Sequence, residues 1–527
     1  MPADRVHELR LAVSSDGPPG SAGDGLSAVL SAVLSDWTVT PLSSEPDGSW
    51  LIAGTVPEHV GSAAYARTAH TLVQQVLRSG MVSRAEADLP VSAYAHPQPT
   101  SPPGPAVTAD CAPGSADPRW AREAIRCDEA WAEPAPPGGR SRGAGVAVGQ
   151  PDTGYTLHPN LGRAGLDLGR DRDVIDDDND ALDPLVRPAQ SPWPLPYPGH
   201  GTATASVIVG RGTEQTGIVG VAPEARVVPI RAVESVVQLF DSDVARAVDH
   251  ARAVGCQVVS MSLGGKGFFG LHRAIRRAVE SGMIVMAAAG NDVGIVVAPA
   301  SYADCLAVAA TGVDDLPWPE SSRGPAVDVS APGWCVHVAG YDWSGAEPVP
   351  VVHRASGTSY AVAHLAGVAA LWLAHHSPAA LRQRYGPSLQ AAFLQLLVTD
   401  GCRVPAGWDG SRWGAGIVDA AALLAAPLPS VDGLVGTGAA GADEVPLTRL
   451  GRLLSVGEDQ LERALSTRLG QSGERLHETL ARFEGELAYH LIEQRGFRDA
   501  LLAGTIGGRN VDAVRAASSP EFAAAFL

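Results

Sequence analysis

Ala355-Ser-Gly-Thr-Ser359 leads directly into Tyr360-Ala-Val-Ala-His-Leu-Ala-Gly-Val-Ala-Ala-Leu-Trp-Leu-Ala374, and this stretch guides the interpretation of the rest of the chain. Residues 360–374 are nearly all small or apolar and contain no proline, which predicts a buried helix. Gly357 and Thr358 supply the turn before it, so Ser359 falls in the first turn. A hydroxyl there lies beside backbone N–H groups without intrahelical partners, which suits a nucleophile and the oxyanion that its attack creates. The alternative is a serine that merely caps the helix.

The composition is that of a large acidic chain. Its 527 residues allow two to four domains, and a hydrophobic content of 45% allows a large core. The formal net charge of −18 and the absence of a Lys/Arg cluster argue against nucleic acid as a partner. No membrane span is expected, because the longest apolar run contains His364 and leads into His375-His376.

The N-terminus and the cysteines indicate in which cellular compartment the protein is expected. Residues 1–10 have no apolar region of the kind found in secretory signals, so we expect a cytoplasmic protein, with secretion as the alternative. The six cysteines are scattered and show no CxxC spacing. A zinc site is therefore not expected, and disulfides are possible but cannot be paired from the sequence.

Residues 1–94 have their own order of predicted elements. Strands are expected at 7–13, 37–40, 50–56 and 83–91, and helices at 25–34 and 60–78. The order β-α-β-β-α-β is that of the ferredoxin-like split βαβ motif. An unrelated small α+β domain is the alternative. Residues 95–118 are rich in Pro, Gly, Ser and Ala, which predicts an exposed linker and the preferred place for a proteolytic cut.

Residues 119–424 alternate between apolar strands and helices. Helices are expected at 242–254 and 271–281, and strands at 145–149, 226–233, 257–263, 283–289 and 305–310. Continuous apolar strands separated by helices predict a parallel sheet buried on both faces, which is an α/β domain. Its ligands should bind at the carboxyl ends of the strands.

The C-terminal part is predicted to be helical. Residues 425–446 form a second Pro/Gly/Ala-rich linker, and 447–527 contain two amphipathic patterns. Ser455-Val-Gly-Glu458 could be a capping box. An apolar stripe follows at Leu476, Leu480, Phe483, Leu487 and Leu491. It is either the core of a small bundle or a docking surface for a partner protein or for the α/β domain.

Three further polar residues fall at predicted strand or helix ends. Asp152 follows a strand, His200 begins a helix in Gly199-His-Gly201, and Asn291 ends a buried strand. Asp, His and Ser are the types that a nucleophilic hydrolase needs, because the imidazole takes the hydroxyl proton and the carboxylate stabilises the imidazolium. An amide aimed at the carbonyl can donate to the oxyanion.

These stretches resemble the motifs of the subtilisin-like serine proteases, or subtilases. Asp152-Thr-Gly154, His200-Gly-Thr202 and Gly357-Thr-Ser359 match the three triad motifs in the order of that family. Ala288-Ala-Gly-Asn291 matches its oxyanion segment, and residues 413–420 match the segment that closes its catalytic domain. The resemblance covers about residues 119–424 and implies a subtilisin-like fold.

The resemblance also implies an activity and its residues. The chain would be a serine endopeptidase that forms an acyl-enzyme and needs no cofactor, with protein or peptide substrates. Asp152, His200 and Ser359 would be the triad, and Asn291 would supply the oxyanion donor. The substrate would lie against Ser262, Leu263, Gly264, Gly265, Ala288 and Val297.

Subtilases commonly carry a ferredoxin-like propeptide, so residues 1–94 are interpreted as an intramolecular inhibitor and the linker as its cleavage region. The sequence also departs from the family pattern. Tyr360-Ala-Val-Ala-His364 replaces Met-Ala-Thr-Pro-His after the nucleophile, and the bulkier Tyr360 could reshape the adjacent wall. His364 is expected to be structural.

Residues 171–183 form the densest carboxylate run, and calcium prefers six to eight oxygen ligands. The run resembles the calcium-binding loop of the proprotein-convertase branch, with Asp176, Asp178, Asp180 and Asp183 as candidate ligands for structural Ca²⁺. A solvated acidic loop is the alternative.

Substrate preference is only weakly indicated. Val297 and Ala298 are apolar and favour a nonpolar or small residue before the scissile bond, whereas Asp292 could attract a basic one. Two other functions also stay open: a processing enzyme or macrocyclase acting on one cognate precursor, and a non-catalytic peptide-binding protein.

Overall fold

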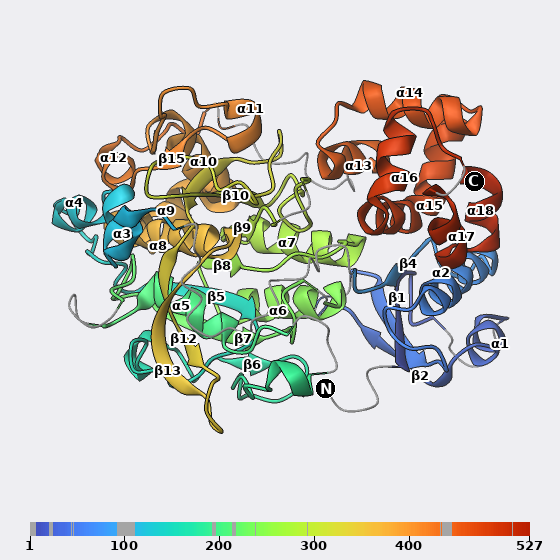
Figure 1. Cartoon of the computed structure of the whole chain (residues 1–527), viewed down its shortest axis with the longest axis horizontal. Coiled ribbons are helices and arrows are strands. Elements are labelled where there is room, and N and C mark those ends of the chain that lie inside the picture. Colours follow the sequence, from blue (N-terminus) through green and yellow to red (C-terminus); the bar gives the residue numbers. More distant parts are fainter. Residues whose placement is uncertain are drawn as a thin grey trace.

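The structure is a computed structural model that describes residues 7–19, 25–43, 45, 47–91, 111–191, 196–212, 218–237, 239–291, 294–432, 434, 445–507 and 510–527. Asp292, most of the linker predicted at 95–118 and half of that predicted at 425–446 lie outside the described residues. The α/β domain occupies one side of the molecule, and the N-terminal sheet and the C-terminal helices lie together on the other side (Figure 1).

A nine-stranded sheet forms the centre of the α/β domain, in the order β14-β15-β11-β10-β9-β8-β5-β7-β6. Neighbouring strands run parallel except for the antiparallel pair β14 and β15. The strands are β5 (Ala147–Asp152), β6 (Arg172–Asp173), β7 (Arg226–Arg231), β8 (Val258–Met261), β9 (Ile284–Ala288), β10 (Leu306–Thr311), β11 (Val329–Pro332), β14 (Cys402–Arg403) and β15 (Ile417–Val418). A hairpin of β12 (Val336–Asp342) and β13 (Val349–Ala355) stands apart. The five predicted strands form β5 and β7–β10, which confirms the predicted fold class.

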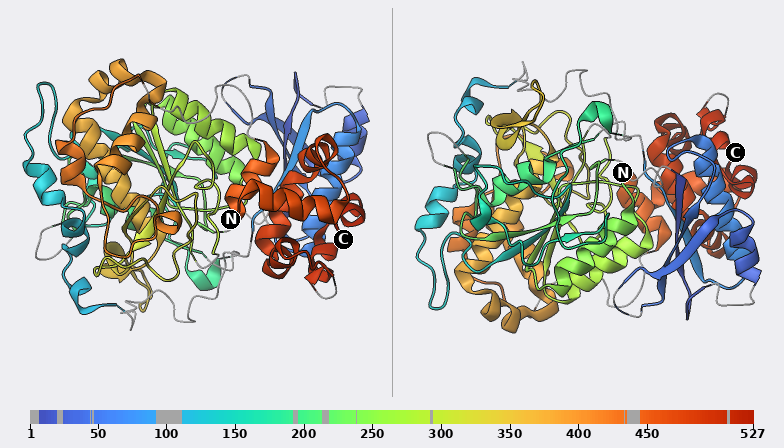
Figure 2. Two further views of the ribbon diagram at one scale, coloured as in Figure 1. Left: turned by 90° about the horizontal axis from the view of Figure 1, so that it is seen from above. Right: turned by 90° about the horizontal axis from the view of Figure 1, so that it is seen from below.

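Helices cover both faces of this sheet (Figure 2). They are α3 (Trp120–Ala124), α4 (Cys127–Ala132), α5 (His200–Val209), α6 (Asp241–Ala253), α7 (Phe269–Glu280), α8 (Thr358–His376), α9 (Pro378–Tyr385), α10 (Leu389–Thr399), α11 (Gly410–Trp413) and α12 (Ala420–Ala425). Successive strand residues face opposite sides, so each strand contributes to two separate apolar clusters. Val258 of β8 belongs to the cluster with α5 and α8, and Val259 to the cluster with α6 and α7.

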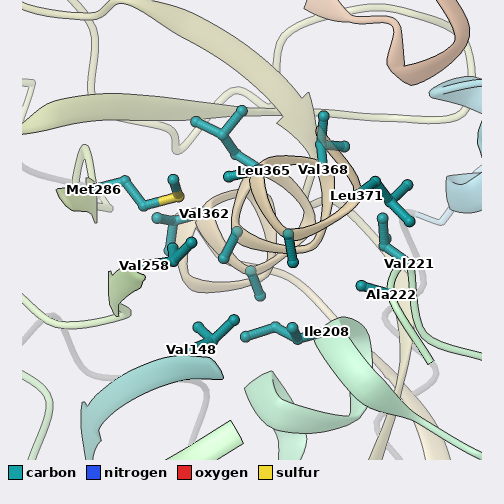
Figure 3. Close-up of a cluster of buried hydrophobic side chains, with 14 of the residues drawn as sticks. Val148, Ile208, Val221, Ala222, Val258, Met286, Val362, Leu365, Val368 and Leu371 are labelled. Atoms are coloured by element: carbon teal, nitrogen blue, oxygen red, sulfur yellow. The ribbon is translucent and has the colours of Figure 1, made fainter. Parts of the chain in front are cut away.

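Helix α8 crosses the first of these clusters and is buried almost throughout, as the apolar run predicted. Figure 3 shows Val362 and Leu365 among side chains from the strands and Ile208 of α5. Gly367 lets α8 approach the chain before β7, because a β-carbon there would lie 2.5 Å from Val221 Cβ. This packing holds the first turn of α8 at the carboxyl ends of the strands.

The N-terminal domain has the predicted ferredoxin-like order. Its elements are β1 (Glu8–Ser14), α1 (Gly25–Ser31), β2 (Ser35–Pro41), β3 (Ser49–Thr55), α2 (Ala63–Arg78) and β4 (Arg84–Asp88). The sheet has the order β2-β3-β1-β4, with every pairing antiparallel. Ser62 caps α2 by accepting a hydrogen bond from Tyr65 N.

The C-terminal part is helical, as predicted, with α13 (Pro446–Leu454), α14 (Glu458–Leu469), α15 (Glu474–Glu493), α16 (Arg495–Leu502), α17 (Asp512–Ala517) and α18 (Pro520–Phe526). The capping-box prediction at Ser455 is wrong. Ser455 adopts a left-handed conformation and ends α13, where its N–H donates to Arg452 O. Gly457 precedes α14 instead, without a side-chain cap.

The apolar stripe of α15 packs into a cluster that also contains the core of the N-terminal domain. Helices α2 and α17 lie side by side (Figure 1), and Arg67 Nη2 donates to Arg515 O at 2.8 Å. Arg482 Nε of α15 donates to Gln74 Oε1 of α2 at 2.7 Å. The C-terminal helices therefore share their core with the N-terminal domain, which neither interpretation of the stripe had included.

A disulfide joins Cys111, before α3, to Cys335, before β12, with their Cα atoms 5.9 Å apart. The sequence could not pair them because 224 residues separate them. Cys127, Cys256, Cys305 and Cys402 are free thiols. Among the described residues, no helix is both long and apolar enough to cross a membrane.

Candidate active site

Asp152 is the last residue of β5 and is 1% exposed. Its Oδ1 accepts hydrogen bonds from Thr153 N and from His200 Nδ1, both at 2.8 Å. Its Oδ2 accepts one from Thr204 Oγ1 at 3.2 Å. These hydrogen bonds fix the direction of the carboxylate toward the imidazole.

His200 is the first residue of α5, with Gly199 before it in the left-handed conformation. The bond from Nδ1 to Asp152 assigns the ring proton to Nδ1 and leaves Nε2 as a proton acceptor. Gly201 lets α5 approach the turn after β5, because a β-carbon at this position would overlap Gly154 O. The two glycines therefore allow the close approach that brings the imidazole to Asp152.

Ser359 is the second residue of α8 and is 7% exposed. Its Oγ donates to Ser262 O at 3.2 Å, and Ser262 Oγ donates to Ser359 O at 2.9 Å. Among the described residues, no hydrogen bond joins Ser359 to His200. Catalytic hydrogen bonds often form only when substrate binds, and rotation about one side-chain bond redirects a serine hydroxyl.

Asn291 follows β9 and is held by the residue next to Ser359. Its Oδ1 accepts hydrogen bonds from Thr358 N at 3.0 Å and Thr358 Oγ1 at 2.8 Å. The carbonyl end of the amide is thereby occupied, and its NH₂ end is left to donate. A β-carbon placed on Gly357 would lie 3.7 Å from both Asn291 Nδ2 and Ser359 N, so two donors flank one position. An oxyanion site needs two such donors beside the nucleophile.

The residues predicted to line the substrate site continue from β8 and β9. Ser262 and Leu263 follow β8 and are buried, and Ala288 is the last residue of β9. Gly264 N donates to Val236 O at 3.0 Å, and Gly265 N donates to Ala298 O at 2.8 Å. Val297 is 2% exposed and lies against Gly264.

The four carboxylates predicted as calcium ligands form hydrogen bonds or ion pairs with different residues. Asp176 contacts Arg231, Asp178 accepts from Asp180 N, Asp180 accepts from Tyr155 Oη, and Asp183 accepts from Gly199 N and Thr153 Oγ1. Among the described residues, no three of these carboxylates bring oxygens within 4.8 Å of one another. The residues therefore do not fit a common calcium cage, which needs six to eight converging oxygens.

Arg231 and Asp183 give the acidic loop structural roles that need no metal ion. The Arg231 guanidinium lies between Asp173 and Asp176, so a fixed cation balances this part of the loop. Asp183 Oδ2 accepts from Gly199 N and Thr153 Oγ1, both at 2.7 Å, and links the residues that precede His200 and follow Asp152. Burial raises the pKa of Asp183.

Sequence reasoning missed the supporting residues. Thr204 lies one turn after His200, a spacing that indicates a shared helix face. Thr358, which positions Asn291, was noticed only as part of the turn. His364 is structural, as expected: its Nδ1 contacts Tyr360 O at 2.8 Å, and burial lowers its pKa to about 4.

Comparison with known proteins gives a consistent result. The subtilase family model (Peptidase S8) matches residues 143–394. Thermitase of Thermoactinomyces vulgaris is 33% identical over 234 residues, which is 44% of this chain and 76% of thermitase. Mycosin-1 of Mycobacterium tuberculosis is 31% identical over 343 residues, which is 54% of this chain and 70% of that protein.

A solved structure supports the fold. Fervidolysin from Fervidobacterium pennivorans, a keratinolytic enzyme related to subtilisin, aligns with a TM-score of 0.54 at 21% identity. The alignment covers 80% of this chain and 61% of fervidolysin. Members of the matched family need no cofactor for catalysis. The family model and the identity to thermitase together show that this chain belongs to the subtilase family and is a serine protease.

Proposed function

We propose that the protein is an endopeptidase that cleaves peptide bonds through an acyl-enzyme formed on Ser359. The observation that carries the proposal is the 2.8 Å hydrogen bond from His200 Nδ1 to Asp152, which leaves Nε2 free to accept a proton. Ser359 begins a helix that packs directly on α5, which carries His200. The subtilase family supports the same roles.

In the proposed reaction, the Ser359 hydroxyl turns from Ser262 O to His200 Nε2 as the substrate enters. Nε2 takes the hydroxyl proton while Oγ bonds to the substrate carbonyl carbon, and Asp152 stabilises the imidazolium. Asn291 Nδ2 and Ser359 N donate to the oxyanion. The imidazolium then gives its proton to the leaving amine as the C–N bond breaks. Water then gives a proton to His200 Nε2 as its oxygen bonds to the acyl carbon, and the bond from that carbon to Ser359 Oγ breaks as the imidazolium returns the proton to Oγ.

Replacing Ser359 with Ala tests this proposal. Hydrolysis of a protein substrate should fall on the order of 10⁶-fold, the size of the loss in subtilisin itself, while the far-UV circular dichroism spectrum is unchanged. Mass spectrometry of the products should show one added water for each cut. Undiminished turnover by the variant would contradict the assignment of Ser359, and joined ends without added water would indicate a macrocyclase.

We also propose that the N-terminal domain inhibits the protease domain until it is cleaved off. Asp88, at the end of β4, accepts hydrogen bonds from Asp241 N at 2.9 Å and Ser242 N at 3.1 Å, so it caps α6 of the protease domain. Arg10 of β1 donates to Ser242 Oγ at 3.1 Å. The apolar cluster that contains Leu89 and Val91 also contains Val297. The residues that follow β4 therefore belong to the same apolar cluster as one residue of the candidate substrate site.

N-terminal sequencing of purified protein after incubation tests the inhibitor proposal. The wild type should acquire a new N-terminus beyond residue 91, and peptide hydrolysis should rise in parallel. The Ser359→Ala protein should keep its original N-terminus. Asp88→Ala removes the cap of α6 and should shorten the delay before activity appears. Full activity of the uncut wild-type chain would contradict the proposal.

A further inference from the structure

Three ionisable side chains outside the candidate active site meet between the N-terminal domain and the C-terminal helices. Glu486 and His490 lie four residues apart on α15, so both are on one face of that helix. His70 of α2 lies against them from the other domain. Each of the three brings a nitrogen or oxygen atom within 4.8 Å of the other two. His490 is 0% exposed, His70 2% and Glu486 5%, so water cannot solvate the group.

The Glu486 carboxylate is buried without a permanent cation beside it. Among the described residues, no Arg or Lys forms an ion pair with Glu486. His70 Nδ1 and His490 Nε2 each lie 3.9 Å from Glu486 Oε1. Ser519 N and Ser519 Oγ donate to the two carboxylate oxygens at 2.7 and 2.8 Å, which holds the carboxylate in one orientation. A buried carboxylate is costly unless a positive charge is near, and a bound cation would supply that charge.

Neither imidazole has its proton fixed from both sides. His70 Nδ1 is hydrogen-bonded to Ala517 O at 3.0 Å. His490 Nε2 is hydrogen-bonded to Ser518 Oγ at 2.9 Å. In the described part of the chain, the opposite nitrogens, His70 Nε2 and His490 Nδ1, are buried without a partner. Each ring can therefore carry its proton on the unpartnered nitrogen and present a lone pair toward Glu486.

We propose that His70, Glu486 and His490 bind a zinc ion that fastens the N-terminal domain to the C-terminal helices. Imidazole nitrogens and a carboxylate are typical ligands of Zn²⁺, whereas Ca²⁺ and Mg²⁺ prefer oxygen ligands. Tetrahedral bonds of about 2.0–2.1 Å set the ligand atoms about 3.3 Å apart, so each of the two nitrogens has to move only about 0.6 Å closer to Glu486 Oε1. Ser518 Oγ, beside His490 Nε2, completes four ligands.

The test measures zinc binding by the full-length Ser359→Ala protein, which lacks the proposed nucleophile and so keeps both terminal domains. After treatment with a chelator and dialysis, it should bind one Zn²⁺ per chain in a calorimetric titration, and bound zinc should raise its unfolding temperature. In this protein, His70→Gln and His490→Gln should each weaken binding at least about 100-fold, because loss of an outer-shell contact alone costs roughly 10- to 100-fold. Glu486→Gln, which keeps the shape of the side chain, should do the same.

His477→Gln is the matched control, because His477 lies on the same helix but is exposed. It should bind zinc as tightly as the Ser359→Ala parent. A parent that binds no zinc would overturn the inference, whether or not every variant folds. Equal affinities of the parent and His490→Gln would overturn it as well. Both results would leave the proposed function as it stands, because no step of this test depends on hydrolysis.

Discussion

In the part of the chain that the structure describes, two groups of a histidine, a carboxylate and a serine invite comparison. The first consists of Asp152, His200 and Ser359 in the α/β domain. The second consists of Glu486 and His490 of α15 with Ser518, beside His70 of the N-terminal domain. Their residue types are those of a hydrolytic triad in both cases, but their hydrogen bonds differ.

The two clusters use the imidazole in opposite ways. In the first, Asp152 occupies Nδ1 at 2.8 Å and Nε2 remains available. In the second, Nε2 of His490 pairs with Ser518 Oγ at 2.9 Å and lies 3.9 Å from Glu486, so hydroxyl and carboxylate compete for one nitrogen. Nδ1 of His490 is buried without a partner. In the second cluster no carboxylate holds Nδ1 of His490, so the ring is not oriented to take a proton from the hydroxyl at Nε2.

The two clusters also differ in how far their side chains are exposed to solvent. His490 is 0% exposed and His200 9%, and Ser518 Oγ donates to Val514 O at 2.7 Å. Ser359 N and Asn291 Nδ2 lie on either side of the Gly357 position in the first cluster, whereas in the second Glu486 accepts from Ser519 N and Ser519 Oγ. The difference teaches that residue types do not define a triad: the carboxylate must orient the ring from one side and leave the other open. We interpret the second cluster as an interdomain contact.

The largest expected effect comes from replacing each histidine in turn. His200→Ala should reduce kcat on the order of 10⁶-fold, because the hydroxyl loses its base. His490→Ala should leave kcat of the matured enzyme within about twofold while lowering stability by about 1–3 kcal/mol, the cost of unpaired buried groups. Steady-state kinetics with active-site titration measures both. Equal losses of kcat would abolish the distinction between the two clusters.

A smaller effect is expected at Asn291, the proposed oxyanion donor of the first cluster. Asn291→Leu should lower kcat by roughly 10²–10³-fold with little change in KM, because the amide is proposed to donate only to the transition state. The split between kcat and KM is the measurement. A variant that raised KM alone would indicate a substrate-binding role for Asn291.

The fold and the residues of the first cluster could be predicted from the sequence, but not every contact that they make. The strands and the ferredoxin-like order follow from local periodicity, and Asp152, His200 and Ser359 follow from motifs in a fixed order. The redirected hydroxyl of Ser359 does not, because it depends on the rotamer beside Ser262 O. The interpretation of the acidic run as a calcium loop overlooked Arg231, which arrives from β7 more than fifty residues later.

No local sequence pattern predicts the contact between the N-terminal domain and the C-terminal helices. His70 and Ala517 lie 447 residues apart, and their hydrogen bond at 3.0 Å results from tertiary packing. The apolar stripe of α15 indicated a buried face without indicating what covers it. The capping-box prediction at Ser455 was wrong because the local pattern is ambiguous. Ser-x-x-Glu fits a serine that starts a helix as well as one that ends the previous helix.

The last expected effect concerns the acid sensitivity that the second cluster contributes. Burial lowers the pKa of His70 to about 4 and that of His490 to about 3, and raises the pKa of Glu486. The groups that face His70 are Glu486, Tyr489, His490 and the Ala517 carbonyl, with a weaker influence from Lys266.

The sign follows from proton binding. Between pH 6.5 and about 4 the unfolded chain protonates the two histidines and the folded chain does not, so stability falls as pH falls, by about 2 kcal/mol per histidine at pH 5. Protonation of Glu486 in the folded state opposes this change. Hydrogen exchange of the metal-free protein, corrected for intrinsic rates, should show α2 losing protection from pH 7 to pH 5. His70→Gln with His490→Gln should reduce this loss in α2 and leave α8 as it is in the wild type, because α8 carries its own buried histidine, His364, whose pKa burial lowers to about 4. A double variant in which α2 loses as much protection as in the wild type would contradict the expectation.

Labelling with a fluorophosphonate tests the central claim most directly, because this probe reacts only with a serine that a neighbouring base has activated. Peptide mapping of the matured wild type should find one adduct, on Ser359, and Ser518→Ala should leave it unchanged. His200→Ala should abolish the adduct. An active enzyme that carries no adduct on Ser359, or carries it on Ser518, would contradict the account.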